Sequence, residues 1–214
     1  MGRDDHFARR TRRPDHRRPV RRRILVLTQG KVTEPAYFDR LRQMYRQVVV
    51  VVKDCPKSPL QMLDVAIAEQ AKAAKNREDR FDSVWVVFDA EERPDEAMLR
   101  ALRQKAGQHE IRLAWSNPCF EIWLLLHLAF SQAPIFNADQ AIRQLATSLP
   151  SYAKDQRAAE RSMAVLIPKV AMALTHAQRL RDGHATRGAG EFPNPATDVD
   201  LLVREIIQAV DGCS

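Results

Sequence analysis

The chain has 214 residues, of which 45% are apolar and 29% charged, a composition typical of one globular domain and not of a fibrous or wholly disordered protein. Its longest nearly apolar run, residues 118–130, is shorter than the about 20 residues that a transmembrane helix needs. No apolar region of a secretory signal follows the basic N-terminus, so we expect a cytoplasmic protein without a membrane partner.

The first segment in chain order is a basic arm, residues 1–22. Ten of the 34 Lys and Arg residues lie within residues 1–23, against three of the 27 acidic residues, so the formal charge of +7 resides there and the rest of the chain is formally neutral. Such a segment buries too little apolar surface to offset its ordering entropy, and we expect it to be disordered when free. It either binds nucleic-acid phosphates, with Arg21, Arg22 and Arg23 at its end, or only solubilises the protein.

Residues 23–212 are expected to form a single domain that begins with alternating strands and helices. Short apolar runs rich in β-branched residues predict strands at residues 23–28, 48–52, 83–88 and 111–115. Cap residues and prolines predict helices that begin at Thr33 or Glu34, at Ser58-Pro59 and at Pro94-Asp95. The five consecutive valines at 48–52 indicate a strand covered on both faces.

After Ser116 the pattern becomes helical. Helices are predicted at residues 118–130, 138–149, 157–181 and 198–210, and a loop at 183–195. The alternation before Ser116 favours right-handed crossovers and a parallel sheet. The predicted fold class is therefore α/β, a four-stranded mainly parallel sheet with helices on both faces and a helical C-terminal part.

The carboxyl ends of the predicted strands are the expected ligand edge, because ligands of open parallel sheets gather there. Asp89 and Glu91 follow the third strand two residues apart, so in extended chain they face the same way. Two hard carboxylates suit Mg²⁺ or Mn²⁺, and such an ion polarises phosphoryl oxygens. The alternative is that these acids cap the next helix or face solvent.

Three further polar residues near this edge are candidates. Lys31 is placed to meet a phosphate, although no phosphate-loop motif surrounds Gly30. Glu34 complements the dipole of the helix it begins. Glu121 lies in a segment that is apolar nearly all round and hence buried, so it needs a cation, a metal or backbone donors.

Cysteine chemistry is not supported by the spacing of the thiols. Cys55, Cys119 and Cys213 form no paired pattern, so we expect reduced thiols and neither disulfides nor a zinc site. A thiol nucleophile at Cys119, with a pKa lowered by a helix N-terminus, would need His127 within reach. Eight residues along one helix do not bring the two side chains together, and His127 is better interpreted as a satisfied core histidine.

These motifs, in this order, resemble the RloB-like family of prokaryotic genome-defence proteins. The first strand and its helix, ILVLTQGKVTEPAYFDRL, resemble the family's strand and C-E-G-x-x-T-E-P-x-Y-F segment. VWVVFDAEE is similar to its V-F-D-x-D-E, and NPATDVDLLVREI to its closing N-P-x-T-x-V-x-x-L-V. SNPCFEIWLLLHL is the most specific piece, and the resemblance runs from about Arg23 to Val210.

The resemblance implies a Toprim-like fold, in which a glutamate after the first strand and a D-x-D motif hold Mg²⁺ for phosphodiester chemistry. It also implies a link to restriction-modification or abortive-infection loci, often beside an AAA-type ATPase. By position, Asp89 and Glu91 match the D-x-D motif and Glu34 matches the family's second glutamate. Gln29 stands in place of the first-strand glutamate, which keeps a carbonyl ligand but loses the charge.

Two functional hypotheses follow. The first is a Mg²⁺- or Mn²⁺-dependent nuclease of anti-phage defence that acts on RNA or DNA. The second is a catalytically weakened member that binds nucleic acid or docks an ATPase, and the oligomeric state stays open. The expected site comprises Asp89, Glu91 and Glu34 as catalytic residues, Asp89, Glu91, Glu121 and Gln29 as metal ligands, and Lys31, Arg21, Arg22 and Arg23 as nucleic-acid contacts.

Overall fold

The computed structural model describes residues 21–90 and 95–211, so the expected disorder of residues 1–20 and the position of Glu91 lie outside the described residues. The described chain forms one sheet with the strand order β2-β1-β3-β4-β5. The strands are β1 (Arg23–Thr28), β2 (Val49–Asp54), β3 (Ser83–Asp89), β4 (Arg112–Asn117) and β5 (Ala196–Thr197). The four predicted strands pair in parallel, and the two-residue β5, which the sequence pattern missed, pairs antiparallel with β4.

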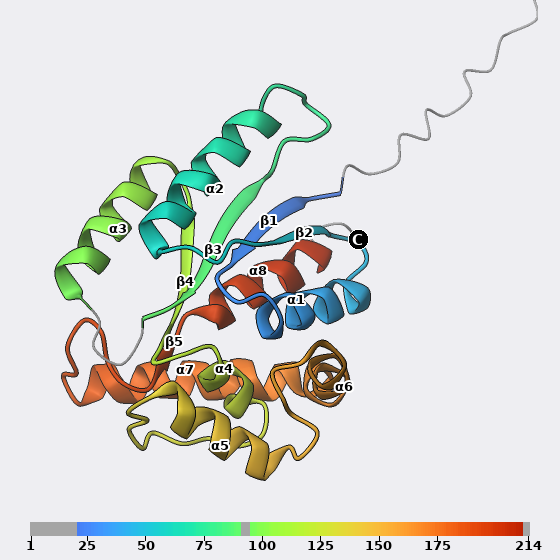
Figure 1. Cartoon of the computed structure of the whole chain (residues 1–214). Coiled ribbons are helices and arrows are strands. Elements are labelled where there is room, and N and C mark those ends of the chain that lie inside the picture. The colour runs from blue at the N-terminus through green and yellow to red at the C-terminus, as the bar shows by residue number, and fades with distance from the viewer. Residues whose placement is uncertain (1–20, 91–94, 212–214) are drawn as a thin grey trace, which may run out of the picture.

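Helices cover both faces of this sheet, as the α/β prediction required (Figure 1). The helices are α1 (Thr33–Met44), α2 (Pro59–Ala73), α3 (Glu96–Gln108), α4 (Glu121–Leu126), α5 (Ala138–Ser148), α6 (Gln156–Leu166), the 3₁₀ turn η1 (Ile167–Lys169), α7 (Val170–Thr186) and α8 (Val199–Asp211). Ile24 and Val26 of β1 belong to the core shared with α1 and the C-terminal helices, whereas Leu25 and Leu27 belong to the core under α2 and α3. This alternation follows from the two-residue period of a strand.

The predicted start signals of two helices are confirmed by their caps. Ser58 accepts a hydrogen bond from the Gln61 backbone N–H while the Gln61 side chain accepts one from Ser58, a capping box with Pro59 just inside α2. Asp95 caps α3 by accepting from the Met98 N–H at 3.0 Å. The two caps begin the helices that follow β2 and β3 along the chain.

The prediction for β2 holds in part, and two predicted boundaries are wrong. β2 is the outermost strand, and its valines pack into the cores on both faces, Val48 and Val50 against one and Val51 against the other. Only Val48 and Val50 are fully buried, so the coverage of the two faces is partial. The helix predicted at 157–181 is interrupted at Pro168, which lacks a backbone N–H and stands in the 3₁₀ turn η1 between α6 and α7. The predicted loop starts later than expected, since α7 continues to Thr186.

The predicted helix over residues 118–130 is also wrong, because only Glu121–Leu126 forms the helix α4. Ser116 and Asn117, which directly precede the predicted helix, belong to β4. Ser116 hydrogen-bonds Thr197 of β5 through the two side-chain hydroxyls at 2.9 Å, so pairing with β5 extends the strand past the predicted end. The shorter helix leaves Glu121 as its first residue, beside the sheet edge.

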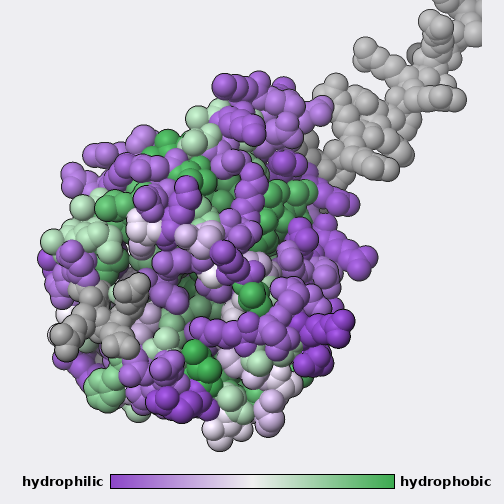
Figure 2. All heavy atoms as spheres, in the orientation of Figure 1, coloured by the Kyte–Doolittle hydropathy of each residue, from purple (hydrophilic) through white to green (hydrophobic). Residues whose placement is uncertain are grey.

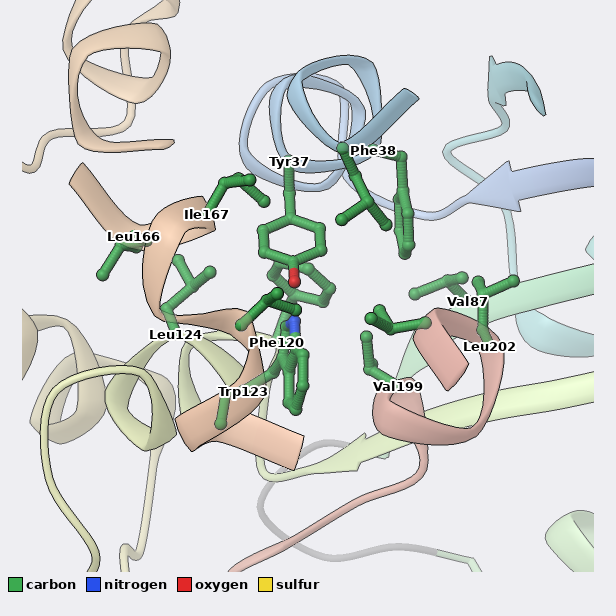
Figure 3. Packing of buried hydrophobic residues seen from close by; sticks show 14 of the residues in the cluster. Tyr37, Phe38, Val87, Phe120, Trp123, Leu124, Leu166, Ile167, Val199 and Leu202 are labelled. Atoms are coloured by element: carbon green, nitrogen blue, oxygen red, sulfur yellow. The ribbon is translucent and has the colours of Figure 1, made fainter. Parts of the chain in front are cut away.

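An aromatic cluster fixes α4 against α1. The Tyr37 ring packs edge-on against Phe120 and Trp123, as Figure 3 shows from close by. His127 is fully buried, and its Nδ1 lies 2.9 Å from the Trp123 carbonyl oxygen, which can only accept. In the neutral ring Nε2 therefore accepts from the Tyr37 hydroxyl at 3.2 Å, in keeping with a pKa that burial lowers to about 4. The interpretation of His127 as a satisfied core histidine is confirmed.

The face of the molecule drawn in Figure 2 is mainly hydrophilic. Figure 2 shows polar side chains over most of one face, with small apolar areas between them. Among the described residues no helix is both long and apolar enough to span a bilayer.

Candidate functional site

The carboxyl edge of the sheet contains a topological switch between two neighbouring strands. After β1 the chain leads to β2 on one side, whereas β3 lies on the other side of β1. Gln29 directly follows β1, and its Oε1 accepts a hydrogen bond from the backbone N–H of Asp89, the last residue of β3, at 3.0 Å. Such a switch point is where α/β sheets bind their ligands, and here it joins two of the predicted site residues.

Glu34 folds back over the loop after β1. Its Oε1 accepts a hydrogen bond from the Gly30 N–H at 2.9 Å, and the residue is 6% exposed. A Cβ atom added at Gly30 would fall onto the Glu34 carboxylate. The glycine is therefore what allows Glu34 to approach the edge from α1.

Asp89 connects the end of β3 to the start of α4. Its Oδ1 accepts a hydrogen bond from the Phe120 N–H at 2.9 Å, so the carboxylate lies beside the residue that precedes Glu121. Burial raises the pKa of Asp89 well above its usual value, and the negative charges of Glu34 and Glu121 raise it further. Asp89 and Glu121, which are far apart in the sequence, thus lie at the same edge.

Glu121 is 2% exposed and is held by two residues from the loop between α5 and α6. Its Oε1 accepts a hydrogen bond from the Tyr152 hydroxyl at 2.7 Å and lies 3.1 Å from the Lys154 Nζ. Burial alone would raise the pKa of Glu121, but the charge of Lys154, with hydrogen bonds from Cys119, Tyr152 and Lys154, brings it below its usual value. The partner that the buried acid required is therefore a lysine that the sequence did not single out.

Glu34, Asp89 and Glu121 together form what we call the carboxylate cluster. Burial raises the pKa of Glu34, and the charge of Glu121 adds to that rise, so the members influence one another electrostatically. When all three carboxylates are ionised, their charge exceeds that of Lys154, which pairs with Glu121 at 3.1 Å. Carboxylate oxygens are the ligands that Mg²⁺ prefers, so the chemistry of the donor set fits a hard divalent cation.

As they stand, the three carboxylates of the cluster are each turned toward a separate donor. Glu34 faces the Gly30 N–H, Asp89 the Phe120 N–H, and Glu121 the pair Tyr152 and Lys154. Within residues 21–90 and 95–211, no three His, Cys, Asp or Glu side chains are grouped closely enough to hold a metal ion. A bound ion would therefore have to replace at least one of these donors.

Gln29 is tied into the loop structure through both ends of its amide. Besides accepting from the Asp89 N–H, its Nε2 donates to the Lys57 carbonyl oxygen at 3.4 Å. A glutamate at this position would keep the acceptor but lose the donor. The residue thus bridges the end of β3 and the loop after β2, and it brings a neutral group to the edge.

The remaining predicted site residues are not all at this edge. Lys31 is exposed on the loop between β1 and α1, at the same end of the sheet. Arg22 and Arg23 lie at the opposite end of β1, where they pair with Glu205 and Asp79, each at 3.8 Å. Six residues of strand separate the two ends by about 20 Å, so Arg21, Arg22 and Arg23 lie at the other end of the sheet from Lys31.

Cys119 is buried beside Glu121, but its environment opposes a nucleophilic role. Burial raises the pKa of the thiol, and the neighbouring charges of Glu121 and Asp89 raise it further. The lowered pKa considered for a thiol at a helix N-terminus is therefore wrong, because burial and nearby carboxylates outweigh any effect of α4.

A comparison with protein families identifies a match that covers most of the chain. The family model described as RloB-like protein matches residues 24–206, from β1 into α8. No curated protein and no solved structure matches the chain.

Proposed function

The chain belongs to the RloB-like protein family, and from its carboxylate cluster we propose a Mg²⁺- or Mn²⁺-dependent phosphodiesterase that cleaves RNA or DNA. The observation that carries this proposal is the convergence of Glu34, Asp89 and Glu121 at the switch point, with a pKa of Asp89 raised by burial and by the other two charges. Strongly perturbed groups at a ligand edge are typical of functional sites.

The proposed ion would be held by Asp89 and Glu121, with the side-chain carbonyl of Gln29 as a further oxygen ligand. Glu91, expected from the sequence as a ligand, lies outside the described residues. Once bound, the ion would supply Lewis-acid polarisation of a phosphoryl oxygen and a more acidic water. Lys31, exposed at the same edge, would hold a substrate phosphate. Glu34, whose raised pKa comes closer to neutrality, would accept a proton at Oε2, because Oε1 is engaged by Gly30.

We place this activity in anti-phage defence beside an AAA-type ATPase, as the family resemblance implies. A neutral body with a basic N-terminal segment supports nucleic acid as the partner, because that segment carries the net positive charge.

The proposal is tested by cleavage assays on single- and double-stranded RNA and DNA with Mg²⁺ or Mn²⁺. Asp89→Asn keeps the acceptor for the Phe120 N–H but removes the charge, and we expect a loss of at least about 100-fold. The control Asp139→Asn changes an exposed aspartate of α5 and should cleave like the wild type. Cleavage that is unchanged in Asp89→Asn, or that persists in EDTA, contradicts the proposal.

A second candidate function, nucleic-acid binding with weakened cleavage, is favoured by Gln29. Its amide bridges the Asp89 N–H and the Lys57 carbonyl and brings no charge to the edge. The variant Gln29→Glu restores an acid, and a gain of cleavage would indicate that the wild type is attenuated. Rapid cleavage by the wild type that Gln29→Glu does not increase would exclude this candidate.

A further inference from the structure

Lys154 stands out because its side chain is half exposed while the carboxylate it pairs with is buried. The side chain of Lys154 is 55% exposed, that of Glu121 only 3%, and Nζ lies 3.1 Å from Oε1. The lysine comes from residues 149–155, between α5 and α6, and not from the sheet edge itself. Its ammonium therefore reaches the carboxylate cluster from the solvent side.

Separation of the ion pair would cost Lys154 and Glu121 different amounts of free energy. Lys154 can return to water at little cost, because most of its side chain is already hydrated. Glu121 cannot be left alone, since an uncompensated buried charge is strongly unfavourable. Lys154 should consequently leave only when another cation takes its place.

The same oxygen of Glu121 has little capacity for additional partners. Oε1 already accepts from the Tyr152 hydroxyl at 2.7 Å and contacts the Lys154 Nζ. The charge of Lys154 also acts on Asp89 and Glu34, whose pKa values it lowers. A single ammonium thus partly neutralises all three members of the cluster, and a divalent ion entering the cluster would meet its repulsion.

Resting on the proposed function, we propose that Lys154 is the resident counter-ion of the carboxylate cluster and a positioning residue that a divalent cation must displace from Glu121. It sets the cation concentration at which the site loads. The displaced ammonium stays tethered at the same edge, where it pairs with a phosphate of the nucleic acid. Binding of the cation therefore makes the Lys154 ammonium available to a substrate phosphate.

The first test measures Mn²⁺ affinity of the full chain by calorimetry or electron paramagnetic resonance. Lys154→Met should bind Mn²⁺ about 10-fold more tightly than the wild type, because the competing charge is gone. Lys154→Arg, which keeps the charge, should stay close to the wild type. Lys75→Met removes an equal charge from an exposed position after α2 and should leave the affinity unchanged.

A second test uses the wild-type protein and measures the chemical reactivity of the Lys154 amine. Acylation by a water-soluble N-hydroxysuccinimide ester, followed by mass spectrometry, should modify Lys154 several-fold faster when Mn²⁺ is present, because the ammonium has left Glu121. Lys75 should show no such change. If Mn²⁺ protects Lys154 or leaves its reactivity unchanged, the ion does not displace the lysine and the proposal is overturned.

The outcomes separate this inference from the proposed function. An unchanged or weaker Mn²⁺ affinity in Lys154→Met overturns the role of Lys154, even if the wild type cleaves nucleic acid in an Asp89-dependent manner. Tighter binding in Lys154→Met together with a wild type that cleaves nothing would support the role of Lys154 and contradict the nuclease. Absence of Mn²⁺ binding in both proteins contradicts both.

Discussion

Among single residues, Asp89 is a group whose charge opposes folding. Burial and the charges of Glu34 and Glu121 raise its pKa well above the usual value. The folded protein therefore holds a proton on Asp89 more tightly than the unfolded chain does. The protonated Asp89 contributes its full stabilisation at pH values below the pKa that it has in the unfolded chain. This contribution to the free energy of unfolding is lost as the pH rises through the higher pKa that Asp89 has in the folded protein.

The first prediction follows from the raised pKa of Asp89. Without divalent ions, Asp89→Asn should melt at a higher temperature than the wild type at pH 7.5, because the variant carries no buried charge there. A gain of about 1 kcal/mol corresponds to about 2–4 °C in a chain of this size. The difference should shrink as the pH falls, since the wild-type carboxyl then becomes protonated.

Thermal melts in EDTA from pH 7.5 down to the lowest pH at which the protein stays folded check this prediction. Asp139→Asn serves as the control, because Asp139 is exposed on α5. Equal melting temperatures of Asp89→Asn and the wild type at neutral pH would show that Asp89 does not carry an unfavourable charge.

Gly30 and Glu34 give the second prediction, a coupling between two residues. Gly30→Ala places a Cβ on the Glu34 carboxylate and should break the hydrogen bond to the residue 30 N–H, at a cost of about 1 kcal/mol. In a Glu34→Ala background the same change should cost much less, because nothing occupies that space. Urea unfolding of the four proteins in the double-mutant cycle measures the coupling; additive costs would contradict the contact.

Among the secondary-structure elements, the loop before α6 has to hold Tyr152 and Lys154 over the edge. It ends at Asp155, whose side chain accepts from the Ala158 N–H at 2.9 Å and caps α6. Asn137 caps α5 in the same way, by accepting from the Gln140 N–H at 2.8 Å. The two caps are chemically alike, but only Asp155 adjoins the lysine.

The third prediction compares these caps. Asp155→Ala and Asn137→Ala should each lower the free energy of unfolding by about 1 kcal/mol, since each leaves a helix N–H without its acceptor. Only Asp155→Ala should also raise the acylation rate of Lys154 in the absence of metal, because the loop loses its anchor. Equal Lys154 reactivity in both variants would mean that the cap does not position the lysine.

Across the molecule as a whole, the basic residues 21–23 and the carboxylate cluster lie at different ends of β1. The described chain begins at Arg21, and Arg22 and Arg23 are fixed by Glu205 and Asp79 at the amino end of the sheet. Residues 1–20 carry a formal net charge of +4, from seven Arg and three Asp, and precede that end. Nucleic acid that contacts both Arg22 or Arg23 and the carboxylate cluster would have to span the length of β1, about 20 Å.

The fourth prediction concerns this separation. Deleting residues 1–20, which leaves the ion pairs of Arg22 and Arg23 intact, should keep the melting temperature and reduce the salt dependence of nucleic-acid binding. Every phosphate that the arm no longer neutralises should flatten the slope of log K against log salt by about 0.9 on duplex DNA. Fluorescence anisotropy at several salt concentrations checks this, and an unchanged slope would identify the arm as only a solubilising segment.

Much of the fold was predictable because strands and helices leave local periodic patterns. The order of the four parallel strands along the chain, the caps at Ser58 and Asp95, and the core role of His127 all follow from neighbouring residues. The edge position of β2 and the short α4 were not predictable, since both depend on which strands lie beside one another. The two-residue β5 is too short to leave a periodic signal.

The order of the amino acids is enough to conclude that this is an α/β protein with acids at the carboxyl ends of its strands, and that the buried Glu121 needs a compensating partner. The packed fold is needed to learn that this partner is Lys154, that Glu34 rests on Gly30, and that Arg22 and Arg23 are bound at the far end of β1. The difference lies in the range of the interactions. The periodic pattern of helices and strands depends on residues that are close in the sequence. The partner of a buried charge depends instead on which loop the packing of the helices places within a few ångströms of it.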